Sequence, residues 1–161
     1  AWLCEHVTVP IFADPVSTAK AGKFRGSLGR LHTIKPNRLE AELLSGVTIA
    51  DRASLERAAD ALLDTGLHRV FISLGGDGLF AADRQGGRLL IPCYPGTMVN
   101  TTGCGDAAMA AVAWAYLQGT DLEGTARAAL AAGAIAMESA ETINPSMSED
   151  ALKQRMAMAT A

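Results

Sequence analysis

The chain has 161 residues, of which 49% are hydrophobic and 19% charged, and its formal net charge is -3. This size and balance are typical of a globular domain with a real core, so we expect one domain over residues 1–161. The negative charge argues against a basic surface for nucleic acid or an anionic membrane. Aromatic residues make up only 5%, too few for a platform on which bases stack.

Three isolated cysteines bear on the compartment and on metal binding. Cys4, Cys93 and Cys104 are far apart and form no Cys-x-x-Cys pair, so neither a zinc knuckle nor a disulfide framework is indicated. This usage favours the reducing cytoplasm. No apolar run approaches the roughly 20 residues of a membrane span, and the first residues lack the features of a signal peptide. We therefore expect a cytoplasmic protein without a nucleic-acid or membrane partner.

The first part of the chain predicts strands that alternate with helices. Apolar runs at residues 7–13 and 32–35 are typical of buried parallel strands, and the Gly-punctuated stretch 17–30 between them leaves room for a short helix. Helical spacing of apolar residues predicts helices at 38–45 and 51–66. Gly46 follows the first helix, and Gly66 ends the second.

The second part of the chain continues this alternation. A strand at residues 69–74 leads through a Gly-rich turn to a strand at 79–82, and a turn at 85–87 makes a hairpin with 88–91. A loop at 101–105 precedes helices at 107–117 and 122–137, and a terminal helix is expected at 148–158. The order predicts an α/β fold with a mainly parallel sheet and helices on both faces.

The segment from Asn100 to Asp106, NTTGCGD, carries the strongest chemical signal. Gly103 and Gly105 leave the backbone bare where a helix begins, at a point where N–H groups lack partners and the helix dipole is positive. Such a turn stabilises an anion, and a phosphoryl group in transfer is one. Asp106 stands beside it and could accept a proton from an attacking hydroxyl. Taken alone, a Gly-x-Gly-Asp is more often a plain helix start.

Other readings of this segment are weaker. The residues also match a dinucleotide fingerprint with Asp121 and Glu123 downstream, but no strand fits between the two helices, which argues against that fold. No P-loop is present. Cys104 at a helix start could be a nucleophile, yet no histidine lies nearby in sequence. The chain's histidines show no spacing typical of metal ligands: His6, His32 and His68.

Three motifs together resemble the PfkB-type, ribokinase-like carbohydrate kinases. NTTGCGDAAMAAVA at residues 100–113 is similar to their C-terminal signature, with Cys104 where another small residue is usual. Asn37 and Glu40 match the family's Asn-x-x-Glu motif, and SLGGDG at residues 73–78 resembles its nucleotide segment. The motifs occur in family order across nearly the whole chain.

The resemblance implies a three-layer ribokinase-like fold and a set of site residues. It implies that Asp106 is the catalytic base and that the backbone of Gly103, Cys104 and Gly105 stabilises the transferring phosphoryl. Mg²⁺ would be positioned by Glu40 and Asn37. The residues expected to contact ATP are Asn37, Ser73, Gly75, Gly76, Gly78 and Gly105.

These upstream motifs also have ordinary structural interpretations. Mg²⁺ prefers oxygen ligands and keeps several waters, which suits a carboxylate with an amide nearby. Without the resemblance, Asn37 and Glu40 would more often be a helix cap and a solvated surface acid. The Gly-rich residues 73–78 alone would more often be a simple hairpin turn.

Within the family, segments 12–20, 33–46 and 144–147 look most like pseudouridine kinases. The implied reaction is the transfer of phosphate from ATP to pseudouridine, although ribose or a fructose phosphate remains open as the acceptor. Many relatives carry Asp at position 100, near a monovalent-cation site. Asn100 removes that charge, which argues against activation by K⁺.

The resemblance covers only the C-terminal half of such a kinase. We find no substrate-binding Gly-Gly motif, sugar-binding Asp or β lid, so we expect little or no kinase activity from this chain alone. An alternative of another class is an ATP-binding or interaction module that transfers no phosphate. An exposed sheet edge would favour a homodimer or pairing with the missing N-terminal half.

Overall fold

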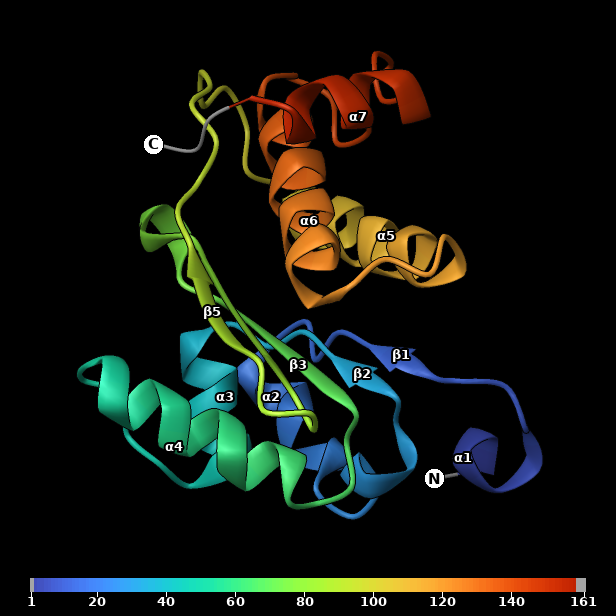
Figure 1. Cartoon of the computed structure of the whole chain (residues 1–161), viewed down its shortest axis with the longest axis vertical. Coiled ribbons are helices and arrows are strands. Elements are labelled where there is room, and N and C mark those ends of the chain that lie inside the picture. Colours follow the sequence, from blue (N-terminus) through green and yellow to red (C-terminus); the bar gives the residue numbers. More distant parts are fainter. Residues whose placement is uncertain (1, 159–161) are drawn as a thin grey trace. The chain divides into compact units, whose positions relative to one another are not determined.

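A computed structural model describes residues 2–158 of the chain (Figure 1). These residues form two compact units. Unit 1 runs through Gly75 and includes Phe80–Leu89, and unit 2 consists of Gly76–Leu79 and the chain from Leu90 onward. The expectation of a single domain over residues 1–161 stays a prediction.

A five-stranded sheet has its strands in chain order. Its first three strands are parallel, with Phe12 beside Thr33 and Thr33 beside Arg69. Figure 1 shows the strands as a fan of neighbouring arrows. The strands are β1 (Phe12–Ala13), β2 (Thr33–Ile34), β3 (Arg69–Ser73), β4 (Leu79–Asp83) and β5 (Arg88–Ile91).

The last two strands form the predicted hairpin. Its turn contains Gly86 at φ 96°, and the Asp83 carboxylate accepts hydrogen bonds from the N–H groups of Gln85 and Gly87. The N–H of Arg84 donates to the carbonyl of His68, so the end of β4 lies beside the start of β3 and the two run antiparallel. The α/β class, the mostly parallel sheet with flanking helices and the hairpin are therefore confirmed.

Three helices of unit 1 lie on one face of this sheet: α2 (Thr18–Ala21), α3 (Arg38–Ser45) and α4 (Arg52–Leu63). Helix α4 presents its predicted apolar stripe to the sheet. Leu55 and Leu62 on the helix share one buried cluster with Val70 and Phe80 on the strands. Burial of these side chains is the main stabilising contribution, about 1.5–3 kcal/mol for each large one.

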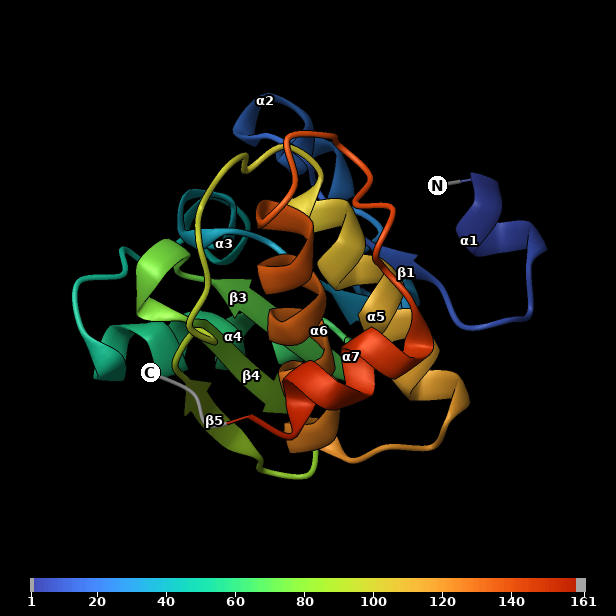
Figure 2. The ribbon, with the colours of Figure 1, turned by 90° about the horizontal axis from the view of Figure 1, so that it is seen from above.

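Unit 2 is built on a pair of Ala-rich helices, α5 (Cys104–Leu117) and α6 (Leu122–Met137), that lie side by side (Figures 1 and 2). Ala111, Ala115 and Ala128 belong to one buried cluster of this unit. Their small side chains let the two helices approach closely. Helix α7 (Glu149–Met156) packs on α6. Among the described residues, no helix is long and apolar enough to cross a membrane.

Several boundaries differ from the sequence-based expectations. Helix α1 (Trp2–His6) was not expected. The strand predicted at 7–13 shrinks to β1 because Pro10 cannot donate a ladder hydrogen bond and the residues directly before it, Thr8 and Val9, are exposed. Two 3₁₀ turns follow α2, namely η1 (Gly22–Phe24) and η2 (Leu28–Arg30), and a third, η3 (Gly75–Asp77), links β3 to β4.

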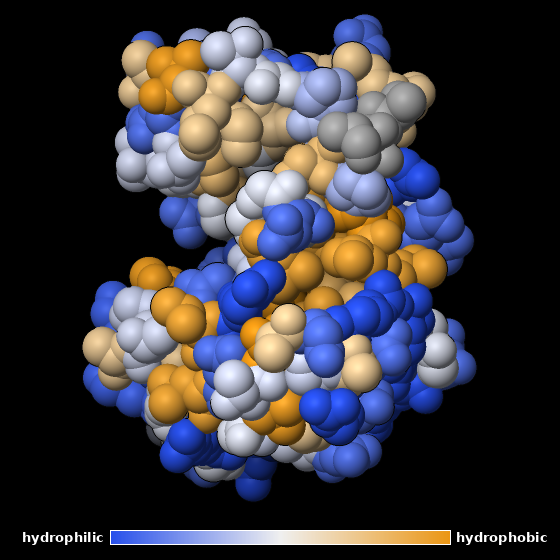
Figure 3. Space-filling model, turned by 90° about the vertical axis from the view of Figure 1, so that its left-hand side faces the viewer, coloured by the Kyte–Doolittle hydropathy of each residue, from blue (hydrophilic) through white to orange (hydrophobic). Residues whose placement is uncertain are grey.

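The surface carries hydrophobic residues among hydrophilic ones, as Figure 3 shows for one face. Single exposed apolar side chains are common in soluble proteins. Four of them lie in the sequence on either side of β1, which is the first strand in the sheet order. The expectation that an exposed sheet edge pairs with another chain stays a prediction. The four residues are Trp2, Leu3, Val9 and Val16.

Two histidines stand directly before β2 and β3, and their rings are stacked. The ring centroids of His32 and His68 are 4.8 Å apart with a 6° angle between the planes, and Phe12 stacks on His32 at 5.2 Å. Burial, followed by the charges of His68 and Arg69, lowers the pKa of His32 from its ordinary value of 6.5. Protonation is therefore easier in the unfolded chain than in the folded one.

This stack predicts a loss of stability in weak acid. The contribution of neutral His32 is complete above pH 6.5 and decreases as the pH falls from there toward its lowered pKa. His32→Phe keeps the stack and removes the titration, so it should lose less melting temperature than the wild type between about pH 7.5 and about pH 5.5. His6→Gln, at an exposed histidine, is the control and should behave as the wild type. Equal losses in all three proteins would contradict the assignment.

Candidate functional site

The predicted site residues fall into two groups, one in each unit. Each group lies at the ends of its own helices or strands. Unit 1 holds Asn37, Glu40, Ser73 and Gly75, and unit 2 holds Gly76, Gly78, Gly103, Cys104, Gly105 and Asp106.

The residues of unit 1 gather at the carboxyl ends of the parallel strands. Asn37, which follows β2, forms a parallel bridge with Ser73 at the end of β3, and the N–H of Ser73 donates to the carbonyl of Pro36 at 3.0 Å. Gly75 follows and is exposed. In open α/β sheets the carboxyl ends of the strands are where ligands bind, so this edge is a suitable place for a nucleotide.

Asn37 and Glu40 cap helix α3 reciprocally. The Asn37 side-chain oxygen accepts from the Glu40 N–H at 3.0 Å, and Glu40 Oε2 accepts from the Asn37 N–H at 2.9 Å. The interpretation of Asn37 as a helix cap is thus confirmed. The interpretation of Glu40 as a solvated surface acid is wrong, because only 2% of the residue is exposed.

The other carboxylate oxygen of Glu40, Oε1, takes no part in this capping arrangement. Oε1 is buried and has no hydrogen-bond partner in the part of the chain that the structure describes. A buried polar atom without a partner costs about 1–3 kcal/mol, and more when it is charged, so it calls for an explanation other than stability. A hard cation that reaches this oxygen directly or through water would supply one.

A buried ion pair lies at the same edge, and the sequence analysis did not single it out. Lys35 Nζ is 2.7 Å from Asp14 Oδ2, with side-chain exposures of 6% and 19%. Lys35 directly follows β2 and Asp14 directly follows β1. Their shared position after parallel strands is the feature of the sequence from which the pair could have been predicted. Removing either partner would leave a buried charge uncompensated.

The Gly-rich segment contains glycines of two kinds. Gly75 and Gly76 are exposed, and a Cβ at either would meet open space, although Gly75 has φ 63°. Gly78 is buried at φ 96°, and a Cβ there would collide with the carbonyl oxygen of Ile91. The hairpin alone therefore explains glycine at 78, whereas a role of these residues in binding ATP stays a prediction.

Helix α5 starts at Cys104, three residues earlier than expected. Its N-cap is Gly103 at φ 87°, whose missing side chain makes room for the carbonyl oxygen of Thr142. The first helical hydrogen bond runs from Ala107 N to Gly103 O at 2.9 Å, and Cys104 N reaches only Thr101 O at 3.4 Å. The N–H groups of Gly105 and Asp106 thus precede any helical acceptor.

No side chain caps this helix start. The other helices of eight or more described residues each begin with a polar side chain that accepts a hydrogen bond from the first turn. Helix α5 has a glycine there and no such bond. Its donors are therefore open to an anion. The capping residues of the other four are Asn37, Asp51, Asp121 and Ser148.

Asp106 lies in this first turn and is exposed. Among residues 2–158, no group forms a hydrogen bond or ion pair with its carboxylate. A free carboxylate beside open N–H donors can accept a proton from a hydroxyl that attacks an anion held there.

Cys104 is half-buried and does not have the environment of a nucleophile. Its sulfur lies 3.8 Å from the carbonyl oxygen of Asn100, and burial raises the pKa of the thiol. The thiol therefore stays protonated at neutral pH, and the structure gives no support to nucleophilic catalysis by this residue.

The alternative sites considered for this chain find no support in the described residues. These residues contain no group of three or more His, Cys, Asp or Glu that could hold a metal ion. Asp121 caps α6 by accepting from the Gly124 N–H at 2.7 Å, and no strand separates α5 from α6 in the described chain. The expectation that Asp121 starts the next helix is thereby confirmed.

Comparison with known proteins identifies the relatives of the chain. Residues 1–150 match the model of the pfkB family of carbohydrate kinases. The pseudouridine kinase of Escherichia coli K12 is 37% identical over 149 residues, which are 92% of this chain and 48% of that protein.

Solved structures agree in fold. A crystal structure of a Clostridium perfringens protein described as a sugar kinase has a TM-score of 0.91 at 32% identity, and covers 96% of this chain and 49% of that one. The ribokinase of Thermotoga maritima has a TM-score of 0.82 at 22% identity, covers 96% of this chain and 51% of that one, and shows the ribokinase-like fold alone. The chain spans about half the length of these relatives. Because the family model matches residues 1–150, the chain belongs to the pfkB family of carbohydrate kinases.

Proposed function

We propose that the complete protein to which this sequence belongs transfers the γ-phosphoryl group of ATP to a hydroxyl of a sugar or nucleoside. The observation that carries the proposal is the uncapped first turn of α5, with open N–H donors and the exposed carboxylate of Asp106. The family of the chain supports the same chemistry.

In this mechanism Asp106 acts as the general base. Its carboxylate takes the proton of the acceptor hydroxyl while that oxygen bonds to the γ-phosphorus and the bond to the leaving ADP oxygen breaks. The backbone N–H groups of Gly103, Cys104, Gly105 and Asp106 stabilise the charge on the oxygens of the phosphoryl group. The donor of Cys104 contributes once its long bond to Thr101 gives way.

Mg²⁺ is the metal that the family implies, and the unpartnered Oε1 of Glu40 fits it. When bound, Mg²⁺ neutralises charge on the ATP phosphates. Glu40 would hold it directly or through water, and the backbone N–H of Asn37 keeps the Glu40 carboxylate in place by donating to its Oε2. The proposed nucleotide contacts are Asn37, Ser73, Gly75, Gly76, Gly78 and Gly105.

We take pseudouridine as the acceptor, with pseudouridine 5′-phosphate and ADP as the products. The identity of 37% to a pseudouridine kinase supports this choice over ribose or a fructose phosphate. The three cysteines form no disulfide in the described chain, which supports a cytoplasmic location. The exposed hydrophobic residues on either side of β1 in the sequence support pairing there with further chain.

Asp106→Asn in the complete protein should lower kcat by at least about 100-fold while ATP still binds, because the amide cannot accept the hydroxyl proton. A coupled assay of ADP release gives kcat, and thermal shift with Mg-ATP gives binding. Asp121→Asn is the matched control, since asparagine caps a helix as well as aspartate does. Unchanged turnover in Asp106→Asn would exclude its role as base.

Glu40→Gln should raise the Mg²⁺ concentration needed for half-maximal turnover, because a neutral amide holds the cation poorly. Its thermal stability without ligand should stay equal or rise, since the variant removes a buried carboxylate with an unpartnered oxygen. Glu42→Gln in the same helix keeps an oxygen for the Ile49 N–H and serves as the control. A Mg²⁺ titration that is identical in Glu40→Gln and the wild type would refute the metal role.

A panel of acceptors tests the substrate. The complete protein should show its highest kcat/KM with pseudouridine and lower values with uridine, ribose and fructose 6-phosphate. The same ADP-release assay measures all four. A preference for ribose or fructose 6-phosphate would agree with the proposed kinase function but would contradict pseudouridine as the acceptor.

A further inference from the structure

The side chain of Asn100 ties two loops of unit 2 together. Its Nδ2 donates to the carbonyl oxygen of Ala140 at 3.2 Å, and its Oδ1 accepts from the N–H of Thr102 at 2.9 Å. The first bond reaches the loop after α6, and the second holds the loop that leads into α5. Both polar ends of this amide are thus used within the chain.

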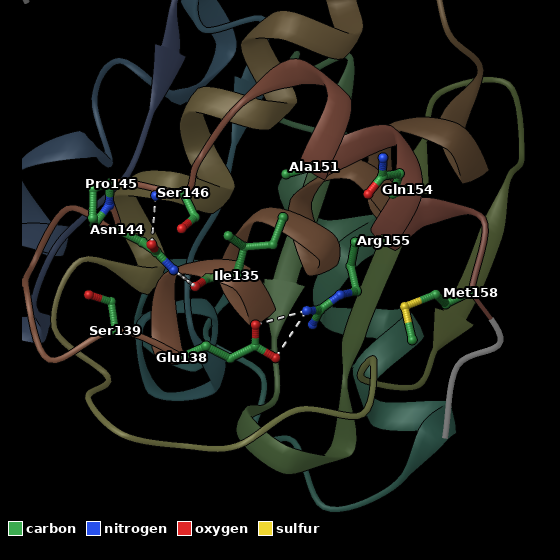
Figure 4. A pocket seen from close by; sticks show the side chains of 10 residues that line it. All are labelled: Ile135, Glu138, Ser139, Asn144, Pro145, Ser146, Ala151, Gln154, Arg155 and Met158. Atoms are coloured by element: carbon green, nitrogen blue, oxygen red, sulfur yellow. Dashed lines mark hydrogen bonds and ion pairs between the residues drawn. The ribbon is translucent and has the colours of Figure 1, made fainter.

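Other backbone carbonyl groups near Asn100 also accept hydrogen bonds from amide N–H groups. The carbonyl of Met137 accepts from the N–H groups of Val99 and Asn100, at 2.8 and 3.1 Å. The buried side chain of Asn144 donates to the carbonyl of Ile135 at 2.6 Å and accepts from Ser146 N at 2.9 Å. Figure 4 shows Asn144 between these partners, beside the ion pair of Glu138 with Arg155.

An aspartate at position 100 could not make the same two hydrogen bonds, because its carboxylate has no donor. An aspartate side chain has no donor for Ala140, so a negative oxygen would face a carbonyl oxygen at close range. A cation between the two would remove that repulsion. An aspartate at this position with a cation beside it would fit this arrangement, whereas the amide donor of this chain leaves no oxygen pair for a cation to bridge.

We infer that the amide of Asn100 takes the place of a bound monovalent cation, so that the loop entering α5 is held without K⁺. Thr142, in the same loop as Ala140, lies against Gly103, and Gly103 begins the turn that carries Asp106. Asn100 is therefore a positioning residue: it acts on Asp106 through the backbone and touches no substrate. For turnover, the inference rests on the proposed kinase function.

The test compares K⁺ with choline at equal ionic strength in the complete protein. The wild type should show the same kcat and the same melting temperature in both salts. Asn100→Asp should lose about fivefold or more in kcat in choline and recover it in K⁺, together with a rise in melting temperature specific to K⁺. Asn100→Ala, which lacks both donor and carboxylate, should be impaired without rescue by K⁺.

Two results would overturn the inference. One is K⁺-specific activation or stabilisation of the wild type, which is measurable even if Asn100→Asp fails to fold. The other is a folded Asn100→Asp that responds equally to K⁺ and choline. The melting temperatures do not depend on catalysis, so a K⁺ response of Asn100→Asp without turnover in any variant would contradict the kinase proposal and leave the cation replacement standing.

Discussion

The backbone donors at the start of a helix must find acceptors, and helix α5 leaves this requirement unmet by its own side chains. Its cap is Gly103, whose conformation and lack of Cβ follow from the close carbonyl of Thr142. The helices that begin at Arg38, Arg52 and Leu122 instead receive a bond from a polar cap. N–H groups that find no acceptor within the helix can bind a group of negative charge.

Unit 1 shows the same relation between local instability and chemistry. The capping box of Asn37 and Glu40 satisfies the first turn of α3, yet it buries a carboxylate oxygen with no donor. A glutamine there would make the same cap at lower desolvation cost, so stability alone does not account for an acid at position 40. A ligand that brings positive charge would account for it.

The sequence predicted best those elements whose ends carry their own signals. Helix α3 was placed to the residue, because Asn37 and Gly46 mark its two ends. The start of α5 was missed by three residues since a glycine cap gives no side-chain signal. The burial of Glu40 and the ion pair of Lys35 with Asp14 depend on packing between distant segments, which spacing along the chain does not reveal. Grouping the site residues needed the family resemblance.

The two kinds of glycine in the segment after β3 have a practical consequence for protein engineering. Position 78 is closed to any side chain by the carbonyl of Ile91, so a library that randomises it would mostly recover misfolded proteins. Position 76 has open space and needs no positive φ. New side chains can therefore be introduced there without a collision with the rest of the described chain.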